Sequence, residues 1–244
     1  MINREIYFDS VREDLFPNGM SQQQVDGQEA ILTCWDKFRD GGDLRFLAYM
    51  LATTKHETAS TMYPIAEYGK GSGSEYGKTD PETGQAYYGR GFVQLTWRDN
   101  YHRADQEIDE KFGMDPGMEW DAEQALVPKY AAAVMFLGME EGWFRQHKLA
   151  DYFNEDDDNP IEARDIINGD VSKNGPMIAD YHYLFLGALQ DAYSAGAPEP
   201  EEPNPDAPEH MPKPPEARQL VVVGIDAPPS VDLQIYVNGE KKWP

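Results

Sequence analysis

Two segments of this 244-residue chain decide its fold: HETASTMYPIAEYG at residues 56–69 and YYGRGFVQLTWRDNY at residues 87–101. The first segment continues an apolar helical pattern as far as Pro64, which has no N–H to donate and disfavours helix in the residue before it. In the second segment, the side chains from Tyr87 to Trp97 alternate in character around Gly89 and Gly91. This pattern predicts a short strand or hairpin. In one unbroken helix, Glu57 and Glu67 would be separated by ~15 Å of rise. A chain break at Pro64 is therefore required if the two carboxylates are to face one cleft.

A helix is predicted over residues 44–62. A stripe of side chains at helical spacing follows one of its faces and reaches Glu57: Phe46, Met50, Thr53 and Glu57. Glu57 therefore follows an apolar row towards the interior. Burial disfavours the charged form of a carboxyl group, so we expect Glu57 to be a proton donor near neutral pH. The alternative for a helix-terminal glutamate is a surface ion pair.

The rest of the chain predicts a mainly α protein with a small β tail. Capping residues and apolar periodicity predict helices over 22–38, with a capping box at Ser21, and over 99–112, 129–141, 160–167 and 176–194. Residues 196–217 contain eight prolines and six acids, which is typical of an extended linker. We therefore predict three parts: a folded domain at 1–195, a linker at 196–217 and a β tail at 218–244.

The tail contains two predicted strands, 219–225 and 231–237, and Asn238-Gly239 offers a tight turn. A unit of this size is too small to bury a core of its own. We expect it to dock on the folded domain or on another chain.

The chain is strongly acidic, with 44 aspartates and glutamates against 21 lysines and arginines and a net charge of −23. Such a surface repels phosphate backbones, so a nucleic-acid partner is not expected. It also repels an anionic cell wall. At ~1 M salt the Debye length is ~3 Å, so this repulsion would be screened. No apolar stretch of about 18 residues is present, so no membrane span is predicted. The first residues show no secretory signal, and Cys34 is predicted to be a buried, inert thiol.

The segment 66–86 contains five glycines and little apolar periodicity, which predicts a long ordered loop. Glu67 at its start is the best candidate for a second carboxylate beside Glu57. Glu75 and Glu82 lie in the same loop and are its rivals.

Four fragments in order carry a family resemblance: HET at 56–58, YYGRG with QLT between 87 and 96, NY at 100–101 and ING at 167–169. Together they resemble glycoside hydrolase family 19, which contains chitinases and phage endolysins. The resemblance covers about residues 20–195. It implies a lysozyme-like, mainly α fold in which a helical lobe and a small hairpin and loop lobe enclose a cleft.

The resemblance also implies roles for individual residues. Glu57 matches the general acid, Glu67 stands near the family's second carboxylate, and Thr96 matches a residue that holds the attacking water with that base. The matches to sugar-binding residues are Gln94, Asn100, Asn168 and Tyr88, although ring packing is an equal alternative for Tyr88. Arg90 is expected to pair with a carboxylate and support the cleft.

The chain departs from the family pattern in two places. Ala59-Ser60 and Gly169-Asp170 replace two common Gly-Gly pairs. The region beyond Asn168, where plant members carry a further acidic residue, does not align clearly. These departures affect the predicted sugar subsites and the charged residues that would support them. They have little effect on the assignment of Glu57 as the general acid.

We therefore expect an inverting hydrolase of β-1,4 bonds between N-acetylated amino sugars, with carboxylates ~6.5–9.5 Å apart and no metal or cofactor. Peptidoglycan is the preferred substrate at this stage and chitin the alternative. A muramidase of this kind would be made in the cytoplasm and act on the cell wall after release, as a bacteriolytic phage endolysin does. The alternative of another class is a non-catalytic glycan-binding or phage structural module.

Overall fold

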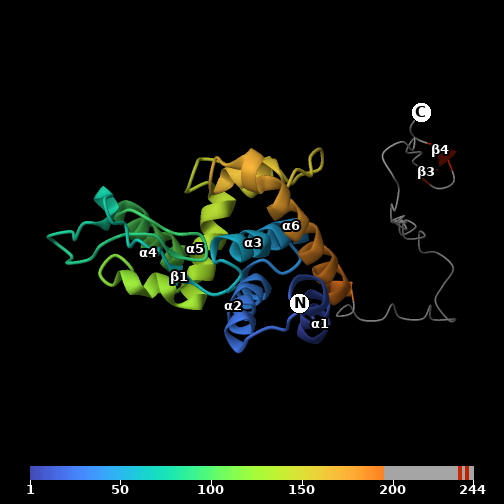
Figure 1. Cartoon of the computed structure of the whole chain (residues 1–244), viewed down its shortest axis with the longest axis horizontal. Coiled ribbons are helices and arrows are strands. Elements are labelled where there is room, and N and C mark those ends of the chain that lie inside the picture. The colour runs from blue at the N-terminus through green and yellow to red at the C-terminus, as the bar shows by residue number, and fades with distance from the viewer. Residues whose placement is uncertain (195–235, 238–239, 242–244) are drawn as a thin grey trace, which may run out of the picture. The chain divides into compact units, whose positions relative to one another are not determined.

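The computed structural model describes residues 1–194, 236–237 and 240–241 of the chain (Figure 1). These residues fall into two separate units, one within Met1–Glu199 and one within Pro200–Pro244. The first is a helical body and the second contains a short hairpin. Within the described part of the chain, no helix is both long enough and apolar enough to cross a membrane.

Six α-helices form most of the described body: α1 (Arg4–Leu15), α2 (Gln22–Phe38), α3 (Leu44–Glu57), α4 (Arg98–Phe112), α5 (Pro128–Glu141) and α6 (Val171–Ser194). The short 3-10 helices are η1 (Glu75–Gly77), η2 (Ala122–Leu126), η3 (Leu149–Asp151) and η4 (Glu162–Ile166). Strand β1 (Ile65–Ala66) pairs antiparallel with β2 (Arg90–Gly91). The predicted class, mainly α with a small hairpin lobe, is confirmed.

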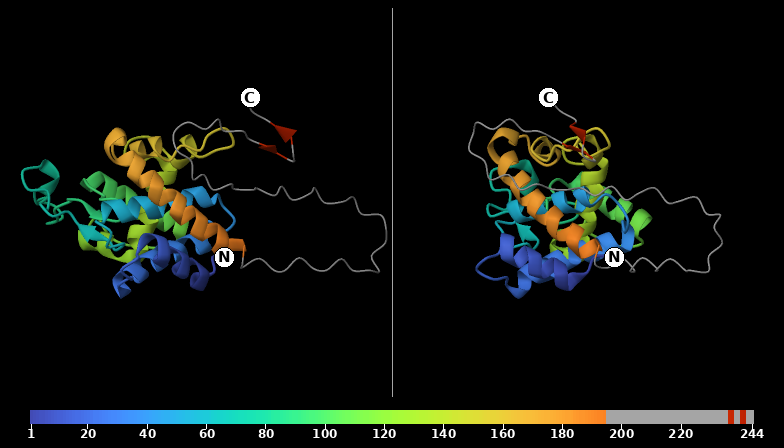
Figure 2. Two further views of the ribbon diagram at one scale, coloured as in Figure 1. Left: turned by 45° about the vertical axis from the view of Figure 1, so that its right-hand side comes forward. Right: turned by 90° about the vertical axis from the view of Figure 1, so that its right-hand side faces the viewer.

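The core is centred on α3, which lies among the other helices and packs against α2, α5 and α6 (Figures 1 and 2). Every side chain from Leu47 to Lys55 is buried. The Ala-rich run of α5 is likewise buried from Ala131 to Met139, because small side chains allow neighbouring helices to approach closely. Glu57, the last residue of α3, is therefore held on one of the most firmly packed elements of the body.

Several helix ends follow the predicted local chemistry. Ser21 and Gln24 form the predicted capping box of α2. Gly113 ends α4 with a left-handed φ of 62°, which glycine adopts without steric strain. Pro128 begins α5, where its missing N–H costs no helical hydrogen bond. Cys34 is buried, as predicted.

The predicted end of the third helix, at residue 62, is wrong: α3 ends at Glu57. The Thr58 hydroxyl donates to the Thr54 carbonyl and accepts the Met62 N–H, which closes a turn directly after the helix. Ala59 and Ser60 within that turn have left-handed φ values of 49° and 63°. The chain break that separates Glu57 from Glu67 therefore occurs at Thr58, ahead of Pro64.

Three other elements differ from the prediction. Helix α1 was not predicted, α6 begins at Val171 instead of residue 176, and the predicted helix at 160–167 is the short 3-10 helix η4. Pro176 lies inside α6, within its first two turns.

The loop between β1 and β2 extends from the helical body at the left of Figure 1 and of the left panel of Figure 2. It begins at Glu67, and Gly71 is its only buried residue between positions 67 and 86. Gly71 and Gly77 touch, since a Cβ on Gly77 would lie 2.1 Å from the Gly71 carbonyl oxygen. The loop is thus closed on itself at its base.

In the second unit, β3 (Tyr236–Val237) pairs antiparallel with β4 (Glu240–Lys241). The other residues of the predicted tail strands, the predicted turn at 238–239 and the linker after residue 195 lie outside the described residues. The division into a domain at 1–195, a linker and a tail at 218–244 stays a prediction.

Candidate active site

A pocket of about 270 Å³ opens where the end of α3 meets the segment that joins β2 to α4. Its lining consists of Glu57, Val93, Gln94, Thr96, Trp97, Asn100, Phe144, Ile167 and Asn168. Five of the residues singled out from sequence line it, namely Glu57, Gln94, Thr96, Asn100 and Asn168. The structure therefore gathers residues from three distant parts of the chain around one carboxylate.

The Glu57 carboxylate is held by an arginine from η4. Arg164 Nη1 lies 2.5 Å from Glu57 Oε1, and Arg164 Nε lies 2.6 Å from Asp170 Oδ1. The Arg164 side chain is 3% exposed and that of Glu57 is 17% exposed. Asn174 donates to the second oxygen of Asp170. One buried guanidinium is thus shared by two carboxylates.

The pKa shifts of Arg164 and Asp170 keep both of these groups charged. Burial alone would lower the pKa of Arg164, but its hydrogen bonds and charge interactions with Asp170 and Glu57 raise it. Burial alone would raise the pKa of Asp170, but Arg164 and Asn174 lower it below its usual value. Arg164 therefore stays charged and Asp170 ionised. The Glu57 carboxylate is thus held by a guanidinium that stays charged and that Asp170 also contacts.

Glu67 lies beside this pocket without lining it. Its backbone N–H donates to the Gly89 carbonyl at 2.7 Å, and the Gly89 N–H donates to Glu67 Oε2 at 3.1 Å. A Cβ on Gly89 would lie 3.4 Å from Glu67 Cβ and 2.8 Å from Gln94 Oε1. Glu67 and Gln94 are therefore neighbours across Gly89, and Gln94 is part of the pocket wall.

A second contact links Glu67 to the pocket. The Tyr76 hydroxyl lies 3.5 Å from Glu67 Oε1, and the Tyr76 ring packs edge-on against Trp97 with centroids 5.3 Å apart. Trp97 lines the pocket and is 50% exposed. The loop-borne carboxylate and the pocket aromatic are thus joined through one tyrosine.

The segment between β2 and α4 has an unusual backbone. Gln94 and Trp97 have left-handed φ values of 56° and 70°, which cost free energy in residues other than glycine. The Gln94 amide donates to the Ile65 carbonyl at 3.2 Å, and the Asn100 amide donates to the Thr96 carbonyl at 2.8 Å. These bonds fix the two amides and leave Thr96 between them on the pocket wall.

Tyr88 and Arg90 are placed away from the pocket. The Arg90 guanidinium stacks on the Tyr88 ring at 3.5 Å and pairs with Glu123 at 2.9 Å. Arg90 Nη1 also donates to the Tyr101 hydroxyl. Tyr88 therefore contributes to packing beneath the hairpin and does not line the pocket.

The rival carboxylates of the loop are engaged elsewhere. Glu75 pairs with Lys78 and Glu82 with Arg98, and both glutamates are exposed. Neither lines the pocket, and Glu67, which contacts Gly89 and Tyr76, remains the candidate loop carboxylate.

A larger groove of about 500 Å³ lies between α2 and the start of α5, and its lining is mostly apolar. Cys34 lines it, but burial raises the pKa of this thiol to about 12, so it is not a nucleophile near neutral pH. None of the predicted site residues borders the groove. The predicted catalytic and sugar-binding side chains that line a pocket all line the Glu57 pocket.

The described body is similar to chitinase C from Streptomyces griseus HUT6037, with a TM-score of 0.50 and 20% sequence identity over 79% of this chain and 76% of that chain. This chain has the fold of chitinase C. A mutant of chitinase C matches with a TM-score of 0.50 and 19% identity, covering 78% of this chain and 92% of that one. A bacterial family 19 chitinase matches with a TM-score of 0.45 and 20% identity over 77% and 94% of the two chains. No protein-family profile and no curated protein sequence matches.

Within this fold, the sequence reasoning missed four residues around Glu57. They are the pocket aromatics Trp97 and Phe144 and the charge partners Arg164 and Asp170. Trp97 lies inside the quoted motif and could have been identified there. Arg164 has no local signal, because its partner Glu57 is 107 positions away in the sequence.

Proposed function

We propose that this protein is an inverting glycoside hydrolase that cleaves β-1,4 bonds between N-acetylated amino sugars. The observation that carries the proposal is the position of Glu57, half-buried in a polar pocket and tied to a guanidinium that a second carboxylate shares. The chitinase C fold is consistent with this chemistry. Glu57 is assigned as the general acid that protonates the leaving oxygen.

Glu67 is assigned as the base that activates water on the opposite face of the sugar. The Gly89 N–H fixes one of its carboxylate oxygens and leaves the carboxylate next to Gln94 at the pocket wall. Thr96 is suited to hold the attacking water, since its side chain lines the same pocket. Single displacement requires space for that water, with carboxyl groups about 6.5–9.5 Å apart.

The pocket chemistry favours an uncharged glycan. Gln94, Asn100 and Asn168 offer amide groups that match N-acetyl and hydroxyl groups, and Trp97 offers an exposed ring. Glu57 is the only charged side chain in the lining of this pocket. The chain as a whole carries a charge of −23, which opposes binding to anionic polymers. A chitin-type polymer of N-acetylglucosamine is therefore the better-supported substrate.

Peptidoglycan remains the second candidate. It has the same β-1,4 linkage between N-acetylated sugars, and the motifs of this chain also resemble those of phage endolysins. This candidate requires salt to screen the acidic surface, since the Debye length is about 8 Å at 0.15 M and about 3 Å at 1 M.

The test compares two substrates with one enzyme preparation. Reducing ends released from N-acetylglucosamine hexamer and colloidal chitin are measured beside turbidity loss of permeabilised bacterial cells, at low and high salt. Chitin hydrolysis without cell lysis supports the chitin-type reading, and the reverse assigns peptidoglycan. Binding of both polymers without turnover of either would contradict the hydrolase and support a glycan-binding module.

A further inference from the structure

The loop from Glu67 to Ala86 is ordered although it buries almost no apolar surface. Gly71 is its only buried residue, and a glycine contributes no side chain to a core. Burial of apolar area, the usual source of order, is therefore nearly absent from this loop. Its position relative to the helices must depend on polar contacts and on the Tyr76 ring.

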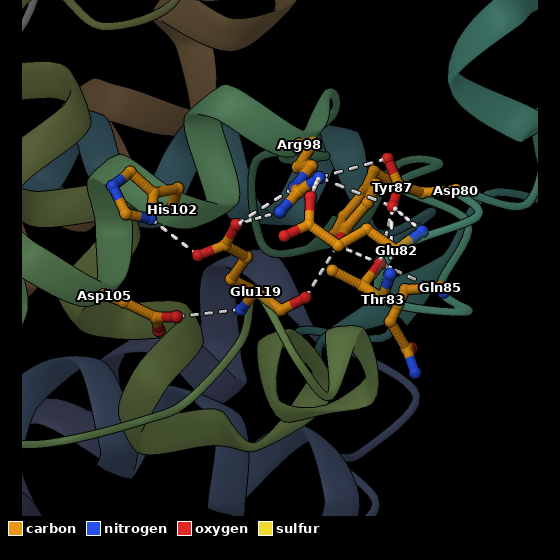
Figure 3. Close-up of polar contacts among 9 residues, drawn as sticks. All are labelled: Asp80, Glu82, Thr83, Gln85, Tyr87, Arg98, His102, Asp105 and Glu119. Atoms are coloured by element: carbon orange, nitrogen blue, oxygen red, sulfur yellow. Dashed lines mark hydrogen bonds and ion pairs between the residues drawn. The ribbon is translucent and has the colours of Figure 1, made fainter.

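Those polar contacts converge on Arg98, the first residue of α4 (Figure 3). Arg98 Nη1 lies 2.7 Å from Glu82 Oε2 and 3.3 Å from Asp80 Oδ2, both in the loop. On the other side, Arg98 Nη2 and Nε lie 2.8 and 2.9 Å from Glu119 Oε1. One guanidinium therefore joins the loop to the segment that precedes η2.

The two groups that Arg98 connects, Asp80 in the loop and Glu119 before η2, each make further hydrogen bonds. Asp80 accepts the backbone N–H groups of Glu82 and Thr83, which holds the loop end in a tight turn. Glu119 accepts from His102 at 2.6 Å, and its own N–H donates to Asp105. Figure 3 shows Arg98 between the loop carboxylates and Glu119. Arg98 is thus the guanidinium that Asp80, Glu82 and Glu119 share.

We propose that Arg98 is a positioning residue, which holds the 67–86 loop against α4 and thereby keeps Glu67 at the edge of the Glu57 pocket. The route from Arg98 to the base is short. Arg98 follows Trp97 directly, the Trp97 ring packs against Tyr76, and the Tyr76 hydroxyl lies beside Glu67. Arg98 itself lines neither the pocket nor the substrate path, so it acts through the loop.

The charges around Arg98 predict how a variant that lacks this arginine should respond to salt. Hydrogen bonds from the Thr83 and Glu82 amides and the charge of Arg98 lower the pKa of Asp80. Burial would raise the pKa of Glu119, but His102 and Arg98 lower it below its usual value. Without Arg98, these two ionised groups and Glu82 would repel one another. Salt screens such repulsion between exposed charges, whereas it would not repair a packing defect.

The test uses the full chain with Arg98→Gln and a matched control, Arg103→Gln. Arg103 lies on the same helix and pairs with Glu107 and Glu141 on its other side. The loop carries two exposed lysines, Lys70 and Lys78. A lysine-specific protease therefore reports loop opening without recognising either altered position.

We expect Arg98→Gln to be cleaved about tenfold faster than the wild type at the loop lysines at low salt, with Arg103→Gln unchanged. High salt should restore most of the protection, and so should a second substitution, Glu82→Gln, in the Arg98→Gln background. Protection that is unchanged in Arg98→Gln would overturn the proposal. A faster cleavage that neither salt nor Glu82→Gln reverses would overturn it too, because it would indicate lost packing.

A second test, by steady-state kinetics, depends on the proposed function. In glycan hydrolysis, Arg98→Gln should lower kcat more than it raises KM, because the base moves while the pocket stays intact, and salt should recover part of kcat. If the wild type hydrolyses no glycan, the proposed function fails while the proteolysis still decides the role of Arg98. If the wild type is active and kcat of Arg98→Gln is unchanged, the positioning role fails alone.

Discussion

Arg164 Nη1 lies 2.5 Å from Glu57 Oε1, although the two residues are 107 positions apart in the sequence. The contact attaches the last residue of α3 to the 3-10 helix η4 and fixes which way the carboxyl group faces. Asp170 binds the same guanidinium from the start of α6. The orientation of the proposed acid therefore depends on tertiary structure and not on its own helix.

Replacing Arg164 by glutamine should reduce stability and activity together. The substitution leaves two partly buried carboxylates without their cation, and breaking such a pair costs about 3 kcal/mol. Urea denaturation would measure the free energy of unfolding. The control is Arg145→Gln, whose pair with Asp165 is 46% exposed at the arginine and should contribute about 0.5 kcal/mol. Equal effects of the two substitutions would contradict the shared-guanidinium account.

The helices that the sequence predicted well are those with local end signals. The Ser21 capping box, Pro128 and Gly113 act within one turn of the chain, so their effect can be inferred from neighbours alone. Helix α1 was missed although Asn3 caps it and Tyr7, Val11 and Leu15 form an apolar row at spacings of four residues, in a sequence that is otherwise strongly charged. The end of α3 was misplaced because Ala59 and Ser60 adopt left-handed backbone, which their identity does not predict.

The candidate site residues that could be predicted from sequence are those that lie in contiguous motifs. Glu57, Gln94, Thr96, Asn100 and Asn168 meet at one pocket in the fold, as their order along the chain had suggested. Arg164 and Asp170 could not be found this way, because their significance appears only when η4 and α6 pack against α3. Tyr88 matched a cleft tyrosine, with ring packing as an equal alternative, and its ring packs against the Arg90 guanidinium.

Replacing Trp97 by alanine should raise KM and also lower kcat, because the Trp97 ring lines the pocket and packs against Tyr76, which lies beside Glu67. Its half-exposed ring offers a face for sugar binding, and losing an aromatic contact of this kind costs about 0.5–1.5 kcal/mol, so KM should rise up to about tenfold. Trp97→Phe should retain most of the binding. Steady-state kinetics on N-acetylglucosamine hexamer would measure both constants.

The control for Trp97 is Trp120→Ala. Trp120 is 59% exposed but does not line the pocket, so its loss should leave both constants unchanged. An unchanged KM for Trp97→Ala would contradict the proposed contact between this ring and the sugar.

His182 should make stability depend on pH. It is fully buried in α6 and stacked on Phe153, and neither ring nitrogen has a hydrogen-bond partner among the residues that the structure describes. Desolvation, and to a smaller extent the charge of Arg45, lower its pKa to about 4, while Asp43 opposes the shift. In the unfolded chain a histidine has a pKa of about 6.5. As the pH falls from about 6.5 to about 4, the unfolded state therefore binds a proton that the folded state excludes.

The free energy of unfolding should thus fall by up to about 3 kcal/mol over this range because of His182 alone. His182→Phe keeps a ring in place and removes the titration. Denaturation at pH 7.5 and pH 4.5 should show a smaller loss of stability for the variant than for the wild type. Identical losses in the two proteins would contradict the prediction.

The most direct test of the central claim is the hydrolysis of N-acetylglucosamine hexamer by the wild type and by Glu57→Gln. Glutamine preserves the size of the side chain and cannot donate the acidic proton, so the rate should fall by roughly 10²–10⁴-fold, the usual contribution of general acid catalysis. Circular dichroism and substrate binding should stay unchanged. The wild type should also release the α-anomer first, as single displacement requires. A Glu57→Gln variant that retains the wild-type rate would contradict the account.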